Sequence, residues 1–303
     1  MEFLYLLEGL RMPVLNEFML FITQLGEETA FLVTALITFW CIDKYLGYYV
    51  LSVGFLGTLG NQFMKLWFCI PRPWVLDPNF TILEQAREAA SGYSFPSGHT
   101  QSAVGTFGAI AYTQNNRWLR TAAILIAVLV PLSRMYIGVH TPLDVGVAAI
   151  MAITLIVILK PVVLKGKKKP ITILLGFMCV AACAYLLFVE LYSFPDDIDP
   201  HNLASGIKNA YTLLGSLAGL VVVYIVDEKW RRFSTKAVWW AQCIKVVLGL
   251  ILVLLVKSGL KTPLNMLLGE SVGRATRYFV IVIVAGILWP CTFKWFAKLG
   301  HKE

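Results

Sequence analysis

Charged side chains are scarce in this chain, and acids are the scarcest of them. Charged residues make up 15% of the 303 positions, with 18 Asp and Glu against 26 Lys and Arg, whereas hydrophobic residues make up 58%. Soluble domains carry about a quarter charged residues and fewer apolar ones. This composition therefore excludes a large soluble domain and leaves room for about nine membrane-spanning helices joined by short loops.

Cysteine patterns typical of metal or redox chemistry are also absent. The six cysteines lie mostly inside apolar runs, and none of them has the CxxC spacing of zinc or thiol–disulfide sites. We interpret all six as small packing residues: Cys41, Cys69, Cys179, Cys183, Cys243 and Cys291.

A continuous basic surface is missing as well. The net charge is +8, but the lysines and arginines are distributed among short segments between apolar runs. That distribution argues against a nucleic-acid partner. The first 25 residues lack the cationic start, apolar core and cleavage site of a signal peptide, so we expect the first spanning helix to direct insertion.

Nine apolar runs predict an all-α fold, a polytopic bundle of about nine transmembrane helices. The runs cover residues 28–42, 46–68, 98–114, 118–137, 142–163, 171–191, 206–226, 237–257 and 273–293. Before them, residues 3–24 mix apolar side chains with Glu8, Arg11, Pro13 and Glu17. That mixture predicts a helix lying in the membrane interface.

The basic residues predict an orientation with the N-terminus outside and the C-terminus in the cytoplasm, because every inner loop is then basic. Most loop acids then lie outside: Asp77, Glu84, Glu88, Asp196, Asp197 and Asp199. Composition shifts at the lysine-rich stretch 165–170. We therefore divide the chain into an interfacial segment (1–27), a core that holds three motifs (28–165) and a C-terminal transmembrane extension (166–303).

The first motif is Lys65 followed six residues later by Arg72-Pro73, where the second predicted span ends. A lysine inside an apolar run is costly and usually marks a functional site or a buried partner. The alternative is a lysine whose ammonium group reaches the interface along its flexible stem.

The second motif is Phe95-Pro96-Ser97-Gly98-His99, where a polar loop meets an apolar helix. Ser97 is a suitable N-cap, so the next backbone N–H groups and the helix dipole favour an anion. Gly98 permits close approach to the main chain, and His99 adds a titratable ring. The alternative is an ordinary capped helix with an incidental histidine.

The third motif runs from Ser133-Arg134 to His140-Thr141-Pro142-Leu143-Asp144. Thr141 can cap the fifth predicted span, and Pro142 suits its first position. Asp144 lies four residues after His140, close enough to accept the imidazole N–H. Alternatively, the Asp144 carboxylate only complements the helix start.

All three motifs lie at the outer ends of predicted spans. Together they supply the groups that a phosphoryl group requires. Several fixed donors stabilise the charge that spreads over the phosphoryl oxygens, and guanidinium groups match those oxygens in pairs. A histidine held by an acid can be the nucleophile, while a second histidine protonates the leaving oxygen. This scheme requires no metal or other cofactor.

The spacing Lys-x6-Arg-Pro, Pro-Ser-Gly-His and Ser-Arg-x5-His-x3-Asp resembles the type 2 phosphatidic acid phosphatase superfamily over about residues 28–165. The resemblance implies a phosphohistidine formed on His140, oriented by Asp144, with His99 as acid and then base. The implied phosphate-binding residues are Lys65, Arg72, Ser97, Gly98 and Arg134. The nine-span plan resembles the glucose-6-phosphatase branch of the superfamily, whereas many of its bacterial lipid phosphatases look like proteins with six spans. Vanadate-dependent haloperoxidases have a similar anion pocket but are typically soluble.

We therefore expect a membrane phosphatase acting on a lipid phosphate or diphosphate at the outer face, in a bacterial plasma membrane or facing a lumen. Membrane lipids and the lipid substrate are the expected partners. A soluble sugar phosphate is the alternative substrate, and a transporter that binds but does not cleave is the alternative class, although transporters place such charges near the membrane midplane. The acidic stretch Asp196, Asp197, Asp199 and His201 is interpreted as a solvated turn rather than a metal site.

Overall fold

The structure is a computed structural model that describes residues 1–303 apart from 88–89, 91, 197, 230–232 and 300–303. Within the described residues every regular element is a helix and none is a strand, which confirms the all-α prediction. The chain forms two compact units. The first unit comprises Met1–Thr34, Tyr49–Pro161 and Ser193–Gly206, and the second comprises Ala35–Tyr48, Val162–Tyr192 and Ile207–Glu303.

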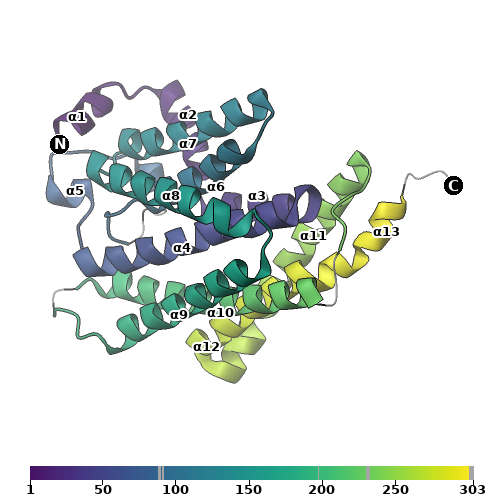
Figure 1. Ribbon diagram of the computed structural model, residues 1–303. Coiled ribbons are helices and arrows are strands. Elements are labelled where there is room, and N and C mark those ends of the chain that lie inside the picture. The colour runs from purple at the N-terminus through teal and green to yellow at the C-terminus, as the bar shows by residue number, and fades with distance from the viewer. Residues whose placement is uncertain (88–89, 91, 197, 230–232, 300–303) are drawn as a thin grey trace. The chain divides into compact units, whose positions relative to one another are not determined.

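Figure 1 shows the helices in chain order. They are α1 (Glu2–Gly9), α2 (Pro13–Gln24), α3 (Glu28–Ile37), η1 (Thr38–Ile42), α4 (Lys44–Phe68), α5 (Pro73–Leu76), η2 (Glu84–Ala86), α6 (Gly98–Thr113), α7 (Arg117–Ile137), α8 (Pro142–Val163), α9 (Lys168–Leu191), α10 (Pro200–Lys229), α11 (Trp239–Gly259), α12 (Lys261–Ile283), η3 (Val284–Leu288), η4 (Trp289–Thr292) and α13 (Phe293–Lys298).

Six helical stretches of the described residues are long and apolar enough to cross a membrane: α7, α8, α9, α10, α11 and the stretch Lys261–Lys298 that contains α12. A seventh results if Pro13–Gln24 and Glu28–Ile42, which meet at a bend of 54°, form one broken span. The prediction of a polytopic membrane protein is confirmed. The count of nine spans and the orientation remain predictions.

The remaining two predicted runs form helices that differ from ordinary spans. Helix α6 has 16 residues, which rise about 24 Å, whereas the hydrocarbon layer is about 30 Å thick. Helix α4 has 25 residues, but Asn61, Gln62 and Lys65 make its second half polar. Both helices carry residues of the motifs, and this accounts for their unusual composition.

The single helix predicted over residues 3–24 is wrong, because the chain forms two helices there. The break occurs before Pro13, which is the first residue of α2, the position where proline is best tolerated. Helix α2 packs against α7, and Ile22 shares a buried cluster with Ala103 and Val130. The Tyr136 hydroxyl donates to Asn16 Oδ1 at 2.7 Å. The N-terminal helices are thus part of the first unit's core.

The second unit contains a buried lysine, Lys245 on α11. Its Nζ donates to the carbonyl oxygen of Trp40 at 2.9 Å and lies 4.4 Å from the centre of the Phe293 ring. Lys44 and Asp227 form an ion pair at 2.9 Å in the same unit. Backbone carbonyls and an aromatic face therefore stabilise the Lys245 ammonium group, which is fully buried.

Candidate active site

The loop before α6 is capped as the sequence predicts. Ser97 Oγ accepts a hydrogen bond from Thr100 N at 3.3 Å, and Ser97 has the extended backbone of an N-cap residue. Asn61 Nδ2 on α4 donates to the carbonyl oxygen of Pro96 at 3.2 Å. Ser97 N donates to the backbone oxygen of Asp144 at 3.1 Å. The start of α6 is therefore tied both to α4 and to the start of α8.

The turn between α7 and α8 positions His140. Helix α7 ends at Gly138, whose φ of 93° lies in the left-handed region that favours glycine. Helix α8 then begins at Pro142, with Thr141 as its cap. Asp144 N donates to Thr141 Oγ1 at 3.2 Å, and Thr141 N donates to Asp144 Oδ2 at 2.7 Å. The predicted capping is confirmed, and the Asp144 carboxylate takes part in it.

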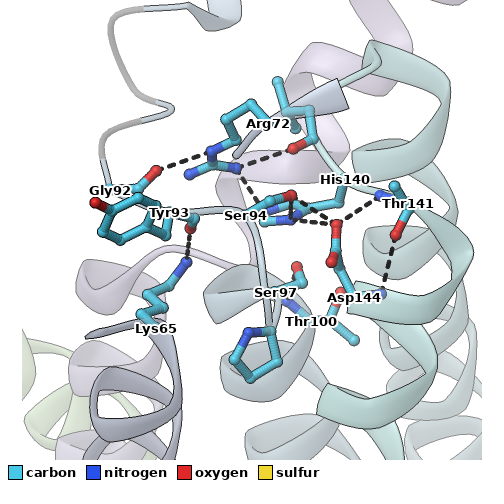
Figure 2. Close-up of polar contacts among 12 residues, drawn as sticks. Lys65, Arg72, Gly92, Tyr93, Ser94, Ser97, Thr100, His140, Thr141 and Asp144 are labelled. Atoms are coloured by element: carbon cyan, nitrogen blue, oxygen red, sulfur yellow. Dashed lines mark hydrogen bonds and ion pairs between the residues drawn. The ribbon is translucent and has the colours of Figure 1, made fainter. Parts of the chain in front are cut away.

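The same carboxylate also lies near His140, in addition to its contacts at the start of α8. His140 Nδ1 lies 3.5 Å from Asp144 Oδ2, and each side chain is only 2% exposed. On the other side of the ring, His140 Nε2 lies 2.9 Å from Arg72 Nη1. A guanidinium group has only donors. We therefore assign the lone pair to Nε2 and the proton to Nδ1, facing Asp144 (Figure 2).

Burial lowers the pKa of His140 well below its ordinary value, and the neighbouring cations of Arg72, Arg134 and Lys65 lower it further. The imidazole is therefore neutral at pH 7, with Nε2 able to attack an electrophile. Burial also lowers the pKa of Arg72, to about 10, although Asp144 opposes this change. Arg72 remains a cation at neutral pH.

Ser94 is a site residue that the sequence analysis missed. Its hydroxyl donates to Asp144 Oδ2 at 2.6 Å and lies 3.4 Å from His140 Nδ1, and the residue is fully buried (Figure 2). Ser94 thus orients the carboxylate that faces the imidazole. A serine in a loop has no distinctive sequence signal, so only the fold brings it to this position.

Two of the predicted cations bind backbone carbonyls of the loops around His140. Arg72 Nε donates to the oxygen of Gly92 at 3.0 Å, and its Nη1 donates to the oxygen of Val139 at 2.9 Å. Lys65 Nζ donates to the oxygen of Tyr93 (Figure 2). Lys65 is buried, so it does not extend to the interface as the alternative interpretation required.

Two further predicted residues, Arg134 and His99, lie against the break between α2 and α3. Arg134, at the end of α7, is 1% exposed, and its Nη1 donates to Thr23 Oγ1 at 2.8 Å. A Cβ added to Gly26 would lie 3.0 Å from the Cβ of His99. The sequence analysis missed Thr23 because the contact joins residues 111 positions apart. A Cβ added to Gly98 would cause no clash, since it would meet only Asn61 Oδ1, at 3.7 Å.

The acidic stretch before α10 caps that helix. Asp199 Oδ1 accepts hydrogen bonds from His201 N at 2.7 Å and from Asn202 N at 3.1 Å. In the described part of the chain, no three His, Cys, Asp or Glu side chains are grouped closely enough to hold a metal ion. Asp197 lies outside the described residues. A helix cap is the role that the contacts of Asp199 support.

Comparisons with known proteins match both halves of the chain. Residues 44–168 match the model of the PAP2 superfamily, and residues 211–302 match the model described as PAP2 superfamily phosphatase, transmembrane extension. Phosphatidylglycerophosphatase B of Bacillus subtilis (strain 168) is 33% identical over 149 residues, which cover 45% of this chain and 69% of that protein.

Two further relatives have different printed activities. Undecaprenyl-diphosphatase BcrC of Bacillus subtilis (strain 168) is 31% identical, over 46% of this chain and 70% of that protein. A probable sphingosine-1-phosphate phosphatase of Dictyostelium discoideum is 35% identical over 143 residues, which cover 43% of this chain and 34% of that protein. The match thus spans about a third of the Dictyostelium relative's length.

Proposed function

Because this chain belongs to the PAP2 superfamily, we propose that it is an integral-membrane phosphatase that hydrolyses a lipid phosphate or diphosphate through a phosphohistidine. The three relatives named above are phosphatases of a glycerophospholipid, a polyprenyl diphosphate and a sphingoid phosphate by their printed names, which supports a lipid substrate. The observation that carries the proposal is the orientation of His140, with Nε2 toward Arg72 and Nδ1 toward Asp144.

In the first step, the lone pair of His140 Nε2 attacks phosphorus and the bond from phosphorus to the leaving oxygen breaks. His99 gives its proton to that oxygen. In the second step, water attacks the phosphohistidine while His99 accepts a proton, so the bond from phosphorus to nitrogen breaks and inorganic phosphate leaves. Asp144 stabilises the positive charge that the imidazole ring carries in the intermediate.

The phosphate-binding residues of the proposal are those of the three motifs. Arg72 exchanges its contact with Nε2 for phosphoryl oxygens, and Lys65 and Arg134 add positive charge. The N–H groups that follow Ser97, beginning with that of Gly98, provide neutral donors at a helix start. These cations supply the charge that metal ions supply in other phosphoryl-transfer enzymes, so we propose that the reaction is metal-independent.

The proposal includes nine spans, an outward N-terminus and an active site at the outer face of a bacterial plasma membrane. The distribution of lysine and arginine among the loops supports this orientation. It also includes the division into segment 1–27, core 28–165 and extension 166–303. The family models support the division, because they match 44–168 and 211–302 separately.

The test is phosphate release by the purified protein with phosphatidate, phosphatidylglycerol phosphate, a polyprenyl diphosphate, a sphingoid phosphate and a sugar phosphate. The H140A variant should release no phosphate from the preferred substrate while it elutes as a folded protein. Brief exposure to substrate labelled in its phosphate should label wild type but not H140A. Full activity of H140A would overturn the mechanism, and binding without any labelled protein would favour the non-hydrolytic transporter.

A further inference from the structure

A cavity of about 560 Å³ adjoins Arg72 in the first unit. Part of its lining comes from residues between α4 and α6, among them Arg72, Arg87 and Tyr93. The rest lies around the start of α10 and consists of Pro195, Ile198, Asp199, His201 and Asn202. Asp199 N donates to the Tyr93 hydroxyl oxygen at 3.1 Å, which fixes the two parts to each other. Arg72 also contacts His140 Nε2, so the cavity and the proposed site share Arg72.

The cavity has room for more than a phosphate group. Small-molecule sites typically measure about 300–1,000 Å³, and a lone phosphate is much smaller than this range. One wall of the cavity lies outside both family matches, which end at residue 168 and begin again at residue 211. It is formed by Pro195, Ile198, Asp199, His201 and Asn202. Residues outside both family matches therefore form part of the lining of the cavity that adjoins Arg72.

The charges of the lining are nearly balanced. Arg72 and Arg87 are cationic, but Arg87 pairs with Glu84 at 2.7 Å, and Asp199 contributes a carboxylate. His201 and Asn202 add an imidazole and an amide, which can both donate and accept hydrogen bonds. A second phosphate would require an excess of positive charge, whereas hydroxyl groups require donors and acceptors side by side. The lining therefore fits a hydroxylated ligand.

We propose that this cavity binds a hydroxylated group esterified to the scissile phosphate, and that His201 and Asn202 select it. The inference rests on the proposed function, since it concerns the leaving group of the same reaction. Two sources supply this chemistry: the terminal glycerol of a lipid headgroup, and a sugar. A polyprenyl phosphate supplies no hydroxyl group at this position and serves as the reference substrate.

The experiment compares kcat/KM for phosphatidylglycerol phosphate, a hexose 6-phosphate and a polyprenyl monophosphate. H201L and N202L should each lower kcat/KM about tenfold for the hydroxylated substrate, mainly through KM, because each removes about one hydrogen bond. The value for polyprenyl phosphate should change less than twofold. N209L is the matched control, because Asn209 lies two turns further along α10 and is not part of the lining.

The outcomes separate the two proposals. If wild type releases phosphate from none of the substrates, the proposed function fails. If wild type is active but H201L and N202L alter all substrates equally, or none of them, the cavity does not select a hydroxylated group and the inference is overturned. Whichever of the lipid and the hexose phosphate shows the selective loss identifies the source of the hydroxyl groups.

Discussion

The orientation of one imidazole ring decides whether this site can attack phosphorus. His140 lies between a cation at Nε2 and a carboxylate near Nδ1, so its lone pair points to the side where Arg72 would hold an anion. Asp144 is fixed by Ser94 Oγ and by Thr141 N. The ring's tautomer therefore depends, through Asp144, on Ser94, which touches neither phosphate nor the attacking nitrogen.

Ser94 is accordingly a positioning residue. We expect S94A to lower kcat about tenfold with little change in KM, because Asp144 loses one hydrogen bond and holds the Nδ1 proton less firmly. S52A is the matched control, since Ser52 is equally buried, on α4 and away from the site. Steady-state kinetics of phosphate release measure both variants. A wild-type kcat for S94A would show that Thr141 alone orients the carboxylate.

The lowered pKa of His140 sets the acidic limit of activity. The neutral ring is the proposed nucleophile, and its pKa lies below the ordinary value of about 6.5, so more than half of it stays neutral when the pH reaches that value. On the acidic side, the profile of kcat/KM against pH, corrected for ionisation of the substrate, should therefore reach half its maximum below about pH 6.5. A half-maximal point above pH 7 would contradict the neutral nucleophile.

Thr23 is likewise a positioning residue, because its hydroxyl group accepts a hydrogen bond from Arg134, a proposed phosphate-binding residue. We expect T23V to raise KM about tenfold, because the buried guanidinium group loses its hydrogen bond to Oγ1. T23S should restore a near wild-type KM, since it keeps the hydroxyl group. T29V is the control on the neighbouring helix α3, where Thr29 is exposed. Equal KM values for T23V and T23S would show that the hydroxyl group plays no part.

At the scale of helices and turns, the α7–α8 turn depends on one glycine. A Cβ at Gly138 would lie 2.8 Å from Arg11 Nη2 and 3.0 Å from the Phe80 ring, at a φ of 93°. G138A should therefore lower the free energy of unfolding by about 1–2 kcal/mol from the backbone alone and lower activity by displacing His140. G146A on α8 is the control, because an added Cβ there meets nothing within 4 Å.

Thermal unfolding in detergent and phosphate release measure both glycine variants. An unchanged melting temperature for G138A would show that the turn accepts a side chain by moving Arg11 and Phe80. An equally large fall in melting temperature for G146A would show instead that added side chains destabilise this region in general.

Sequence reasoning succeeds here where the signal is local. The caps at Ser97 and Thr141 and the first-position proline of α8 are confirmed because each depends on residues within four positions. Ser94 and Thr23 were missed because their partners lie 50 and 111 residues away. The N-terminal helix was predicted as one because Pro13 was treated as part of an amphipathic run rather than as a helix start.

At the scale of the whole chain, the geometry of the first unit bears on the number of spans. Ser97 N and the Asp144 backbone oxygen are 3.1 Å apart, so α6 and α8 begin on the same side of the membrane. Helix α7 is long enough to cross and packs along α6. If α7 crosses, the chain must return to its starting side between these two points, so we predict that α6 crosses as well, although it has only 16 residues.

Asn61 in the second half of α4 donates to the carbonyl oxygen of Pro96, so α4 ends on the side where α6 begins. If α4, α6 and the bent α2–α3 segment all cross, the predicted nine spans result and the termini lie on opposite sides, whereas six spans would leave them on the same side. In cells, D196C should react with a membrane-impermeant maleimide and K167C only after permeabilisation, with the six native cysteines replaced beforehand. Labelling of K167C but not of D196C in intact cells would show the opposite orientation. Labelling of both in intact cells would contradict a crossing by α9 (Lys168–Leu191).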